Sequence, residues 1–203
     1  EKNKSRLLEI AEACKGLLGD DFLCFGHQST IEVVSNILGR NDLTLATAES
    51  CTGGLIADTF TNLPGSSEYF KGGVVSYSDQ SKIQILGVPK KLIQEVSAVS
   101  SSVAIAMAQS VASKMDADYG LSVTGYAGPD GGTEKDPAGT VYIGLHTPSG
   151  TLSQRFSWKS GRLATKKRAL HAAIDLLRRK IIAEKRNVVE AHENGFEGTA
   201  SRR

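Results

Sequence analysis

Apolar residues recur along this chain with two spacings, and the spacings separate candidate helices from candidate strands. Apolar positions three and four residues apart predict amphipathic helices, which we expect at 4–18, 31–38, 55–60, 81–86, 101–115 and 162–184. Short apolar or alternating runs, bounded by glycine, proline and small polar residues, predict strands at 22–25, 43–48, 70–77, 119–123, 139–146 and 152–158. Strands that alternate with helices in this way predict an α/β sandwich.

Two features of the pattern bear on the architecture and on the extent of the domain. The tight turn Pro148-Ser149-Gly150 joins the last two predicted strands, so we expect an antiparallel pair within a mixed sheet that is covered by helices. Residues 1–28 have the size of an incomplete module, and we expect them to be a remnant of an upstream or connecting region. Residues 187–203 are polar and contain glycine, which predicts a disordered tail. The folded domain should then span 29–186.

Composition narrows the class of protein. The 203 residues are 40% hydrophobic and 23% charged, as in ordinary globular domains, and a net charge of +2 does not indicate a nucleic-acid partner. No apolar run approaches the roughly 18 residues of a membrane helix, so we expect no membrane partner. The 3 cysteines and 4 histidines are scattered, without zinc-ligand spacing. We therefore expect a reducing, cytoplasmic compartment and no metal.

The segment from Ala48 to Gly54, AESCTGG, lies where a predicted strand gives way to a helix. Sites in α/β sheets lie at such carboxyl ends of strands, and a helix N-terminus offers free N–H groups to an oxyanion. Ser50 is therefore a candidate nucleophile, and the alternative is that Ser50 or Thr52 only caps the helix. Cys51 is a rival nucleophile, although a small buried residue is the simpler interpretation. Glu49 could be a general base or an ion-pair partner, and we assign it no role.

A serine nucleophile needs a base, and the segment from Tyr77 to Lys82, YSDQSK, supplies two groups that can move a proton. Lys82 could act as a base if burial lowered its pKa, and its apolar neighbours Ile83 and Ile85 are consistent with partial burial. The alternative for Lys82 is a solvated position on the surface. Tyr77 could relay a proton, orient Lys82 or simply pack.

Two other regions could contact a ligand. The loop 124–132 is rich in glycine, which lets backbone N–H groups approach a phosphate or an oxyanion closely. It lacks the ending of a phosphate-binding P-loop, so a plain turn is the alternative. The predicted helix 162–184 carries many arginines and lysines, which could hold a phosphate or form a solvated face.

Taken together, these segments resemble the C-terminal domain of the CinA (competence/damage-inducible protein) family, which also occurs as stand-alone nicotinamide mononucleotide amidohydrolases. The resemblance covers about residues 29–182, and residues 1–28 resemble the end of the region that connects this domain to an upstream one. The matching segments are 48–54, Pro64-Gly65-Ser66-Ser67, Gly72-Gly73-Val74-Val75, Tyr77-Ser78, Lys82, Leu86-Gly87-Val88, Ala98-Val99-Ser100, Thr124-Gly125, Ala127-Gly128-Pro129 and Gly139-Thr140-Val141-Tyr142.

The resemblance implies a fold and an activity. The fold is a three-layer α/β/α sandwich with a mixed, mostly parallel sheet of about five strands. The activity is hydrolysis of the amide of nicotinamide mononucleotide to nicotinic acid mononucleotide and ammonia, without a cofactor. The resemblance would make Ser50 the nucleophile and Lys82 its base, with Tyr77 in the proton relay.

The resemblance also implies how the substrate is held. Thr124 and Gly125 would line the site. The family often has an arginine near the start of the last helix, and Lys166 occupies the matching position here, with Arg162 close by. A lysine cannot form the bidentate pair that an arginine forms with a phosphate. The expected substrate-binding residues are Thr52, Gly53, Thr124, Gly125, Gly128, Lys166 and Arg162.

Other functions stay open at this stage. Tyr126 and Asp130 depart from the small residues common in that loop of the family. One alternative is therefore a catalytically silent nucleotide-binding or regulatory domain, and another is hydrolysis of a different amide. We expect a small pyridine nucleotide as partner. We also expect a homo-oligomer, most simply a dimer.

Overall fold

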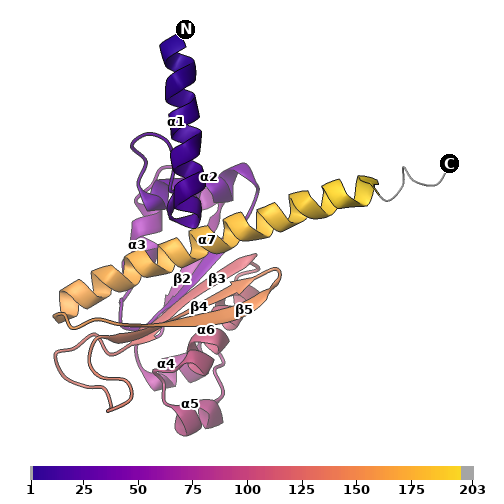
Figure 1. Cartoon of the computed structure of the whole chain (residues 1–203). Helices are drawn as coiled ribbons and strands as arrows, with labels where there is room; N and C mark the ends of the chain where they lie inside the picture. The colour runs from indigo at the N-terminus through magenta and orange to yellow at the C-terminus, as the bar shows by residue number, and fades with distance from the viewer. Residues whose placement is uncertain (1, 198–203) are drawn as a thin grey trace.

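The computed structural model describes the backbone of residues 2–197 and the side chains of residues 5–186. A five-stranded sheet forms the middle layer, with helices on both faces (Figure 1). The strands are β1 (Leu45–Glu49), β2 (Phe70–Val75), β3 (Tyr119–Gly125), β4 (Thr140–Thr147) and β5 (Gly150–Ser157). The helices are α1 (Lys2–Leu18), α2 (Thr30–Arg40), α3 (Leu55–Thr61), α4 (Asp79–Gln84), α5 (Lys90–Val96), α6 (Ser101–Lys114) and α7 (Arg162–Glu197), with 3-10 turns η1 (Gly19–Asp21) and η2 (Ser66–Glu68).

The strand order is β2-β1-β3-β4-β5. β1 pairs in parallel with both β2 and β3, while β4 pairs antiparallel with β3 and with β5. β4 therefore runs against the other four strands, which confirms the mixed, mostly parallel sheet. The chain leaves β1 toward β2 on one side and leaves β3 toward β4 on the other. A crevice at such a switch point, at the carboxyl ends of β1 and β3, is where α/β folds bind ligands.

Two apolar layers hold the helices on the sheet. α2, α3 and α7 contribute side chains such as Val34, Phe60 and Leu177 to the core on one face. α4, α5 and α6 cover the opposite face, where Met107 of α6 lies in a second buried cluster. α6 packs especially close to the sheet, because a methyl group placed on Gly120 would overlap the carbonyl of Ala108. These layers confirm the three-layer α/β/α sandwich.

The structure corrects two expectations about the elements and adds one helix that was not expected. Residues 22–25, expected as a strand, form no strand and lie between η1 and α2. α5 was not expected, because its seven residues carry too short an apolar pattern to be recognised. α7 continues to Glu197, so the disordered tail expected from 187 is replaced by helix as far as 197. The rest of that expectation, 198–203, lies outside the described residues.

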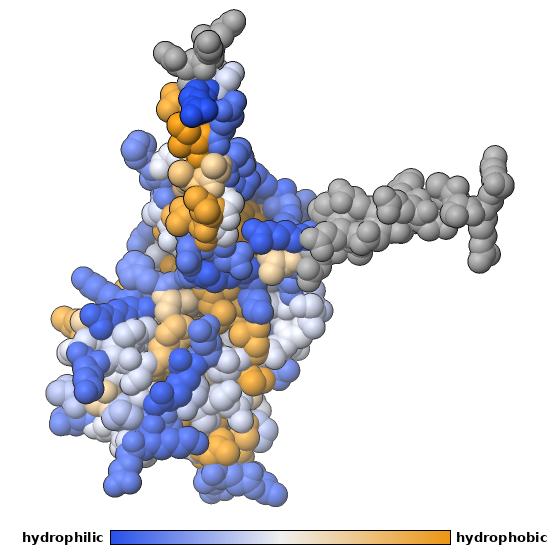
Figure 2. Space-filling view, viewed as in Figure 1, coloured by the Kyte–Doolittle hydropathy of each residue, from blue (hydrophilic) through white to orange (hydrophobic). Residues whose placement is uncertain are grey.

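The first helix stands apart from the sandwich. α1 projects from the body of the molecule in Figure 1, and Figure 2 shows apolar side chains along its surface. These exposed apolar residues are Leu7, Leu8, Ile10, Leu17 and Leu18. The segment after α1 is attached to α7, because Arg178 donates hydrogen bonds to the carbonyls of Asp20 and Phe22 at 2.6 and 3.2 Å. Within the described residues, no helix is both long enough and apolar enough to cross a membrane.

Candidate active site

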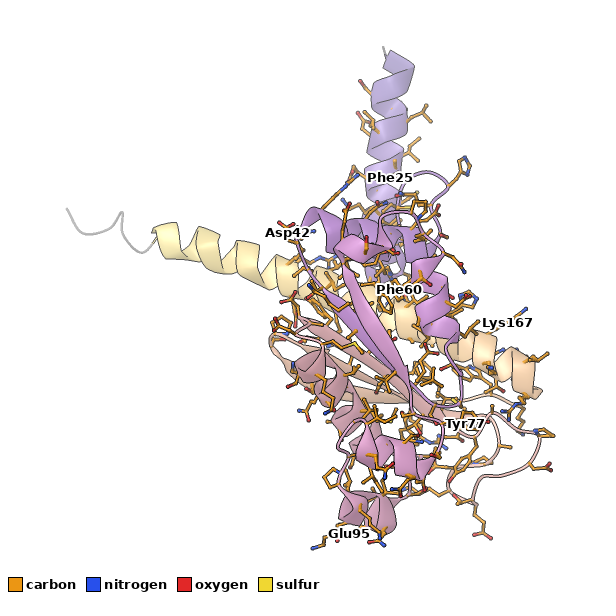
Figure 3. The ribbon with its side chains drawn as sticks, turned by 180° about the vertical axis from the view of Figure 1, so that it is seen from behind. Phe25, Asp42, Phe60, Tyr77, Glu95 and Lys167 are labelled. Atoms are coloured by element: carbon orange, nitrogen blue, oxygen red, sulfur yellow. The ribbon has the colours of Figure 1, made fainter. Side chains whose placement is uncertain are left out.

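A cavity of about 480 Å³ opens at the carboxyl ends of β1 and β3. Its volume is within the usual range for a small-molecule site, about 300–1,000 Å³. Tyr77 lies in Figure 3 at the end of the sheet from which the loop after β3 extends. Six of the residues expected from the sequence line this cavity: Ser50, Lys82, Tyr77, Thr124, Gly125 and Arg162.

The centre of the site is a contact between Lys82 and Ser50. The Lys82 ammonium nitrogen, Nζ, lies 3.1 Å from Ser50 Oγ, within hydrogen-bond distance. It also donates to the backbone carbonyl of Ser76 at 3.0 Å, which fixes the direction of the side chain. Two residues 32 positions apart in the sequence are thus brought together as a nucleophile and base could be.

Burial gives Lys82 the property that a base requires. Its side chain is only 2% exposed, and the nearest carboxylate, Asp79, lies 4.0 Å away and is itself largely exposed. Loss of water around the ammonium lowers the pKa of Lys82 from its ordinary value of 10.5, and the smaller effect of the Asp79 charge acts in the opposite direction. A larger fraction of neutral amine is therefore available near neutral pH than for a solvated lysine.

Local structure explains why Lys82 reaches the serine. Ser78 caps α4 in a capping box with Ser81, so the helix begins directly after β2 and its connecting residues. The Ser76 N–H donates to the carbonyl of Glu49 at 2.8 Å, which ties the end of β2 to the end of β1. Lys82 lies in the last turn of this short helix, and its side chain is directed back over the junction toward Ser50.

Glu49, to which the sequence assigned no role, shapes the turn that carries Ser50. Its carboxylate is 1% exposed and accepts N–H groups from Gly54, Ile56 and Ala57 at 3.0, 3.1 and 2.8 Å. A carboxylate with three backbone donors anchors the start of α3 and neutralises its unpaired N–H groups. The only signal for this role in the sequence is an acidic residue just before a helix start.

Cys51 and Thr52, the two residues that follow Ser50, are both buried and differ from it in their contacts. Burial raises the pKa of the Cys51 thiol to about 12, so Cys51 is a protonated, weak nucleophile at neutral pH. Thr52 is fully buried, and among the described residues its Oγ1 has no hydrogen-bond partner. Thr52 does not line the cavity, unlike the expectation for a substrate-binding residue.

Arg162 and Tyr77 form one wall of the cavity. The Arg162 guanidinium donates to the Tyr77 hydroxyl at 2.7 Å and to the Gly128 carbonyl at 3.2 Å. Gly128 therefore orients Arg162 through its carbonyl without lining the cavity. The Tyr77 phenol makes this bond to Arg162, and no hydrogen bond among the described residues joins it to Lys82 or Ser50. Its part in a proton relay stays a prediction.

Lys166 occupies a different place from Arg162. Its Nζ lies beside Gly53, where a Cβ on that glycine would be 3.6 Å away, and neither residue lines the cavity. The basic residue that faces the cavity from the start of α7 is therefore Arg162, one helical turn earlier than the position matched from the family. Over the described part of the chain, no group of three or more histidine, cysteine, aspartate or glutamate side chains could hold a metal ion.

Comparisons with known proteins agree with this fold. A model of the CinA C-terminal domain matches residues 27–181. A CinA-like protein from Desulfotalea psychrophila is 43% identical over 184 residues, which cover 90% of this chain and 45% of that protein. A CinA-like protein from Dictyoglomus thermophilum is 41% identical over 187 residues, which cover 90% of this chain and 44% of that protein. The chain thus spans less than half the length of these two relatives.

Solved structures give the same result. A CinA superfamily protein from Escherichia coli has a TM-score of 0.71 and 29% identity, covering 80% of this chain and 97% of that one. The competence/damage inducible protein CihA from Agrobacterium tumefaciens has a TM-score of 0.69 and 31% identity, covering 76% of this chain and 97% of that one. The chain belongs to the CinA family, which confirms the resemblance drawn from its motifs.

Proposed function

We propose that this domain is a serine amidohydrolase that converts nicotinamide mononucleotide to nicotinic acid mononucleotide and ammonia. The observation that carries the proposal is the 3.1 Å contact between a buried lysine amine and the hydroxyl of Ser50 at the edge of a ligand-sized cavity. A buried lysine that only stabilised the fold would be expected to pair closely with a carboxylate. Lys82 is instead buried beside a serine hydroxyl, with the Asp79 carboxylate 4.0 Å away.

The proposed reaction has two halves. Neutral Lys82 takes the proton of Ser50, and the resulting alkoxide attacks the carboxamide carbon of the substrate. The C–N bond breaks, and the Lys82 ammonium returns a proton to the departing nitrogen, which leaves as ammonia. Lys82 then takes a proton from water, whose oxygen attacks the ester carbon, and Ser50 Oγ leaves with that proton as nicotinic acid mononucleotide is released.

A backbone group is available for the negative oxygen that forms during attack. Among the described residues, the N–H of Cys51, which lines the cavity, donates no hydrogen bond to another residue. It is in the turn that Glu49 holds in place, next to the nucleophile. A donor that is fixed before the reaction stabilises such an oxyanion by roughly 3 kcal/mol.

The charges along the cavity suit a mononucleotide. Arg162 offers a guanidinium to the phosphate, and the amine of Lys82 would be neutral where the carboxamide binds. This arrangement places one cation at one wall of the cavity rather than spreading positive charge around the substrate's own pyridinium.

The first test is the release of ammonia from nicotinamide mononucleotide by the wild type and by Ser50→Ala. We expect the substitution to reduce kcat by about 10⁴-fold or more, because the acyl-enzyme can no longer form. Cys51→Ala is the matched control for the rival nucleophile and should keep most of the activity.

Equal rates for the wild type and Ser50→Ala would eliminate Ser50 as the nucleophile. Calorimetric binding of the mononucleotide by a wild type that releases no ammonia would indicate a silent nucleotide-binding domain instead. A wild type that releases ammonia only from other amides would keep the mechanism and change the substrate.

A further inference from the structure

Ser97, at the end of α5, has a backbone conformation that is unusual for its residue type. Its φ and ψ are 73° and 152°, a region that glycine occupies readily and that other residues rarely adopt. The surrounding hydrogen bonds hold it there: its N–H donates to the Ile93 carbonyl at 3.0 Å, and its carbonyl accepts from the Ser100 hydroxyl at 2.9 Å. A glycine would fit this position with less strain, so the serine side chain needs an explanation.

The side chain of Ser97 lies in the wall of the active-site cavity. Ser97 Oγ is 3.2 Å from the Tyr126 hydroxyl, and both residues line the cavity that contains Ser50 and Lys82. The pair joins two loops, one after α5 and one after β3. Ser97 is exposed and Tyr126 is half-buried, so a molecule in the cavity can reach both hydroxyls.

The hydrogen-bonding capacity of the pair indicates what it can bind. Ser97 Oγ accepts the N–H of Val99 at 3.3 Å, and one of the two hydroxyl protons is used between Ser97 and Tyr126. One O–H donor and at least one acceptor lone pair are left for a ligand. A neutral group that both donates and accepts matches this set, whereas a phosphate, which only accepts, is better served by Arg162.

We propose that Ser97 and Tyr126 form a specificity element that binds a sugar hydroxyl of the ligand. This inference rests on the proposed function, in which the carboxamide reacts at Ser50 and the phosphate lies near Arg162. The ribose between them is then the part of the substrate with groups that both donate and accept. The strained backbone of Ser97 is retained because the hydroxyl is needed in the cavity.

The test compares ligands that differ in one hydroxyl. Dissociation constants are measured by calorimetry on the Ser50→Ala chain, which prevents turnover, for nicotinamide mononucleotide and its 2′-deoxy and 3′-deoxy analogues. We expect one of the analogues to bind about 3- to 10-fold more weakly, the value of one hydrogen bond. Ser97→Ala and Tyr126→Phe should each weaken binding of the intact ligand by a similar factor, and neither should weaken binding of that analogue further.

Ser97→Gly separates the hydroxyl from the backbone. It should bind the intact ligand as weakly as Ser97→Ala, because both lack the hydroxyl. It should also melt about 2–6 °C higher than Ser97→Ala, because glycine relieves the positive φ. A binding loss in Ser97→Gly alone would assign the effect to the shape of the loop and overturn the proposal.

The failure of this inference and that of the proposed function give different results. If deoxy ligands bind as tightly as the intact one, or if the preference survives in Ser97→Ala and Tyr126→Phe, the sugar contact is wrong while ammonia release stands. Ribose 5-phosphate and its 2-deoxy and 3-deoxy analogues carry no carboxamide. If the pair distinguishes these sugars but the wild type releases no ammonia, the hydroxyl contact stands and the amidohydrolase activity fails. No binding of any ribosyl ligand overturns both.

Discussion

Lys82 and Arg178 are both cations with only 2% of their surface exposed, but their partners differ. Arg178 donates to the Asp175 carboxylate at 2.8 Å and to the backbone carbonyls of Asp20 and Phe22. Lys82 donates to three neutral oxygens, Ser76 O, Ser50 Oγ and, at 3.5 Å, Tyr77 O, and the nearest carboxylate oxygen among the described residues is 4.0 Å away.

The two environments favour opposite uses of a buried charge. Arg178 stays charged and joins the segment after α1 to α7, so it acts in stability. Lys82 is desolvated without a matching anion, so its charged form is penalised and its neutral form can take a proton. Burial by itself therefore does not distinguish a candidate catalytic cation from a structural one, whereas burial without compensation, beside a hydroxyl and a cavity, indicates a candidate.

Lys82→Met gives the largest effect that we expect from this comparison. The substitution keeps the unbranched apolar stem of the side chain and removes the base, so ammonia release should fall by about 10³-fold. The melting temperature should stay the same or rise, because an uncompensated buried amine is replaced by an apolar group. Activity and melting are measured on the same preparation. A large loss of stability would mean that Lys82 is a structural residue like Arg178.

Arg178→Met should have the opposite pair of effects, with a loss of stability and no loss of activity. Three hydrogen bonds to a charged donor are lost at a buried position, so the free energy of unfolding should fall by about 2–3 kcal/mol. Ammonia release per folded molecule should stay near the wild-type value, because Arg178 does not line the cavity. Arg179→Met is the matched control. Arg179 also binds Asp175 but is 38% exposed, so its removal should cost less than about 1 kcal/mol.

Denaturant unfolding of the two arginine variants measures this difference. Equal losses for Arg178→Met and Arg179→Met would show that burial does not distinguish them. A loss of activity in folded Arg178→Met would connect the α1 segment to the active site.

The pH dependence of kcat/KM tests the comparison further, because below the plateau the rate should change by about tenfold per pH unit. If the neutral amine of Lys82 is the base, kcat/KM should rise with pH and reach a plateau above the lowered pKa of Lys82. The plateau should therefore begin below the ordinary lysine pKa of 10.5. A rate that is still rising at that pH would contradict the desolvation of Lys82.

The lowered pKa of Lys82 also makes the free energy of unfolding depend on pH. Because the folded-state pKa of Lys82 is lowered, folding is most favoured by this residue above its unfolded pKa, where the amine is neutral in both states. That contribution is lost as the pH falls from 10.5 through the lowered pKa. In Lys82→Met, this part of the pH dependence of unfolding should disappear, whereas Arg178→Met should retain it.

Much of the fold was predictable because the pattern was local. The strands and most helices follow from apolar spacing and from caps within a few residues. The expected strand at 22–25 failed because apolar residues form a strand only where a neighbouring strand is available to pair with them. α5 was missed since two turns of helix give too few apolar positions to show a period.

The site was predictable in its residue types and less so in its arrangement. From their motifs, Ser50 in AESCTGG and Lys82 were recognisable as a candidate nucleophile and a candidate base, and the structure brings them within 3.1 Å of each other. The bonds that hold Arg162 to Tyr77 and Gly128 and the Ser97–Tyr126 pair were not, because they join elements far apart in the chain. The turn-holding role of Glu49 was also missed, although its contacts are local, because an acidic residue six positions before a helix is a weak signal.

The sequence alone determined the α/β class, the family and the chemical groups available, since these depend on short-range order and on residue identity. Tertiary structure decided which of those groups meet and which lose their water. Lys82 is an ordinary lysine in the sequence and becomes a candidate base only when β1, β2 and α4 pack around its amine. The reason is that a pKa depends on the dielectric and the charges around a group, and these are set by packing rather than by neighbours along the chain.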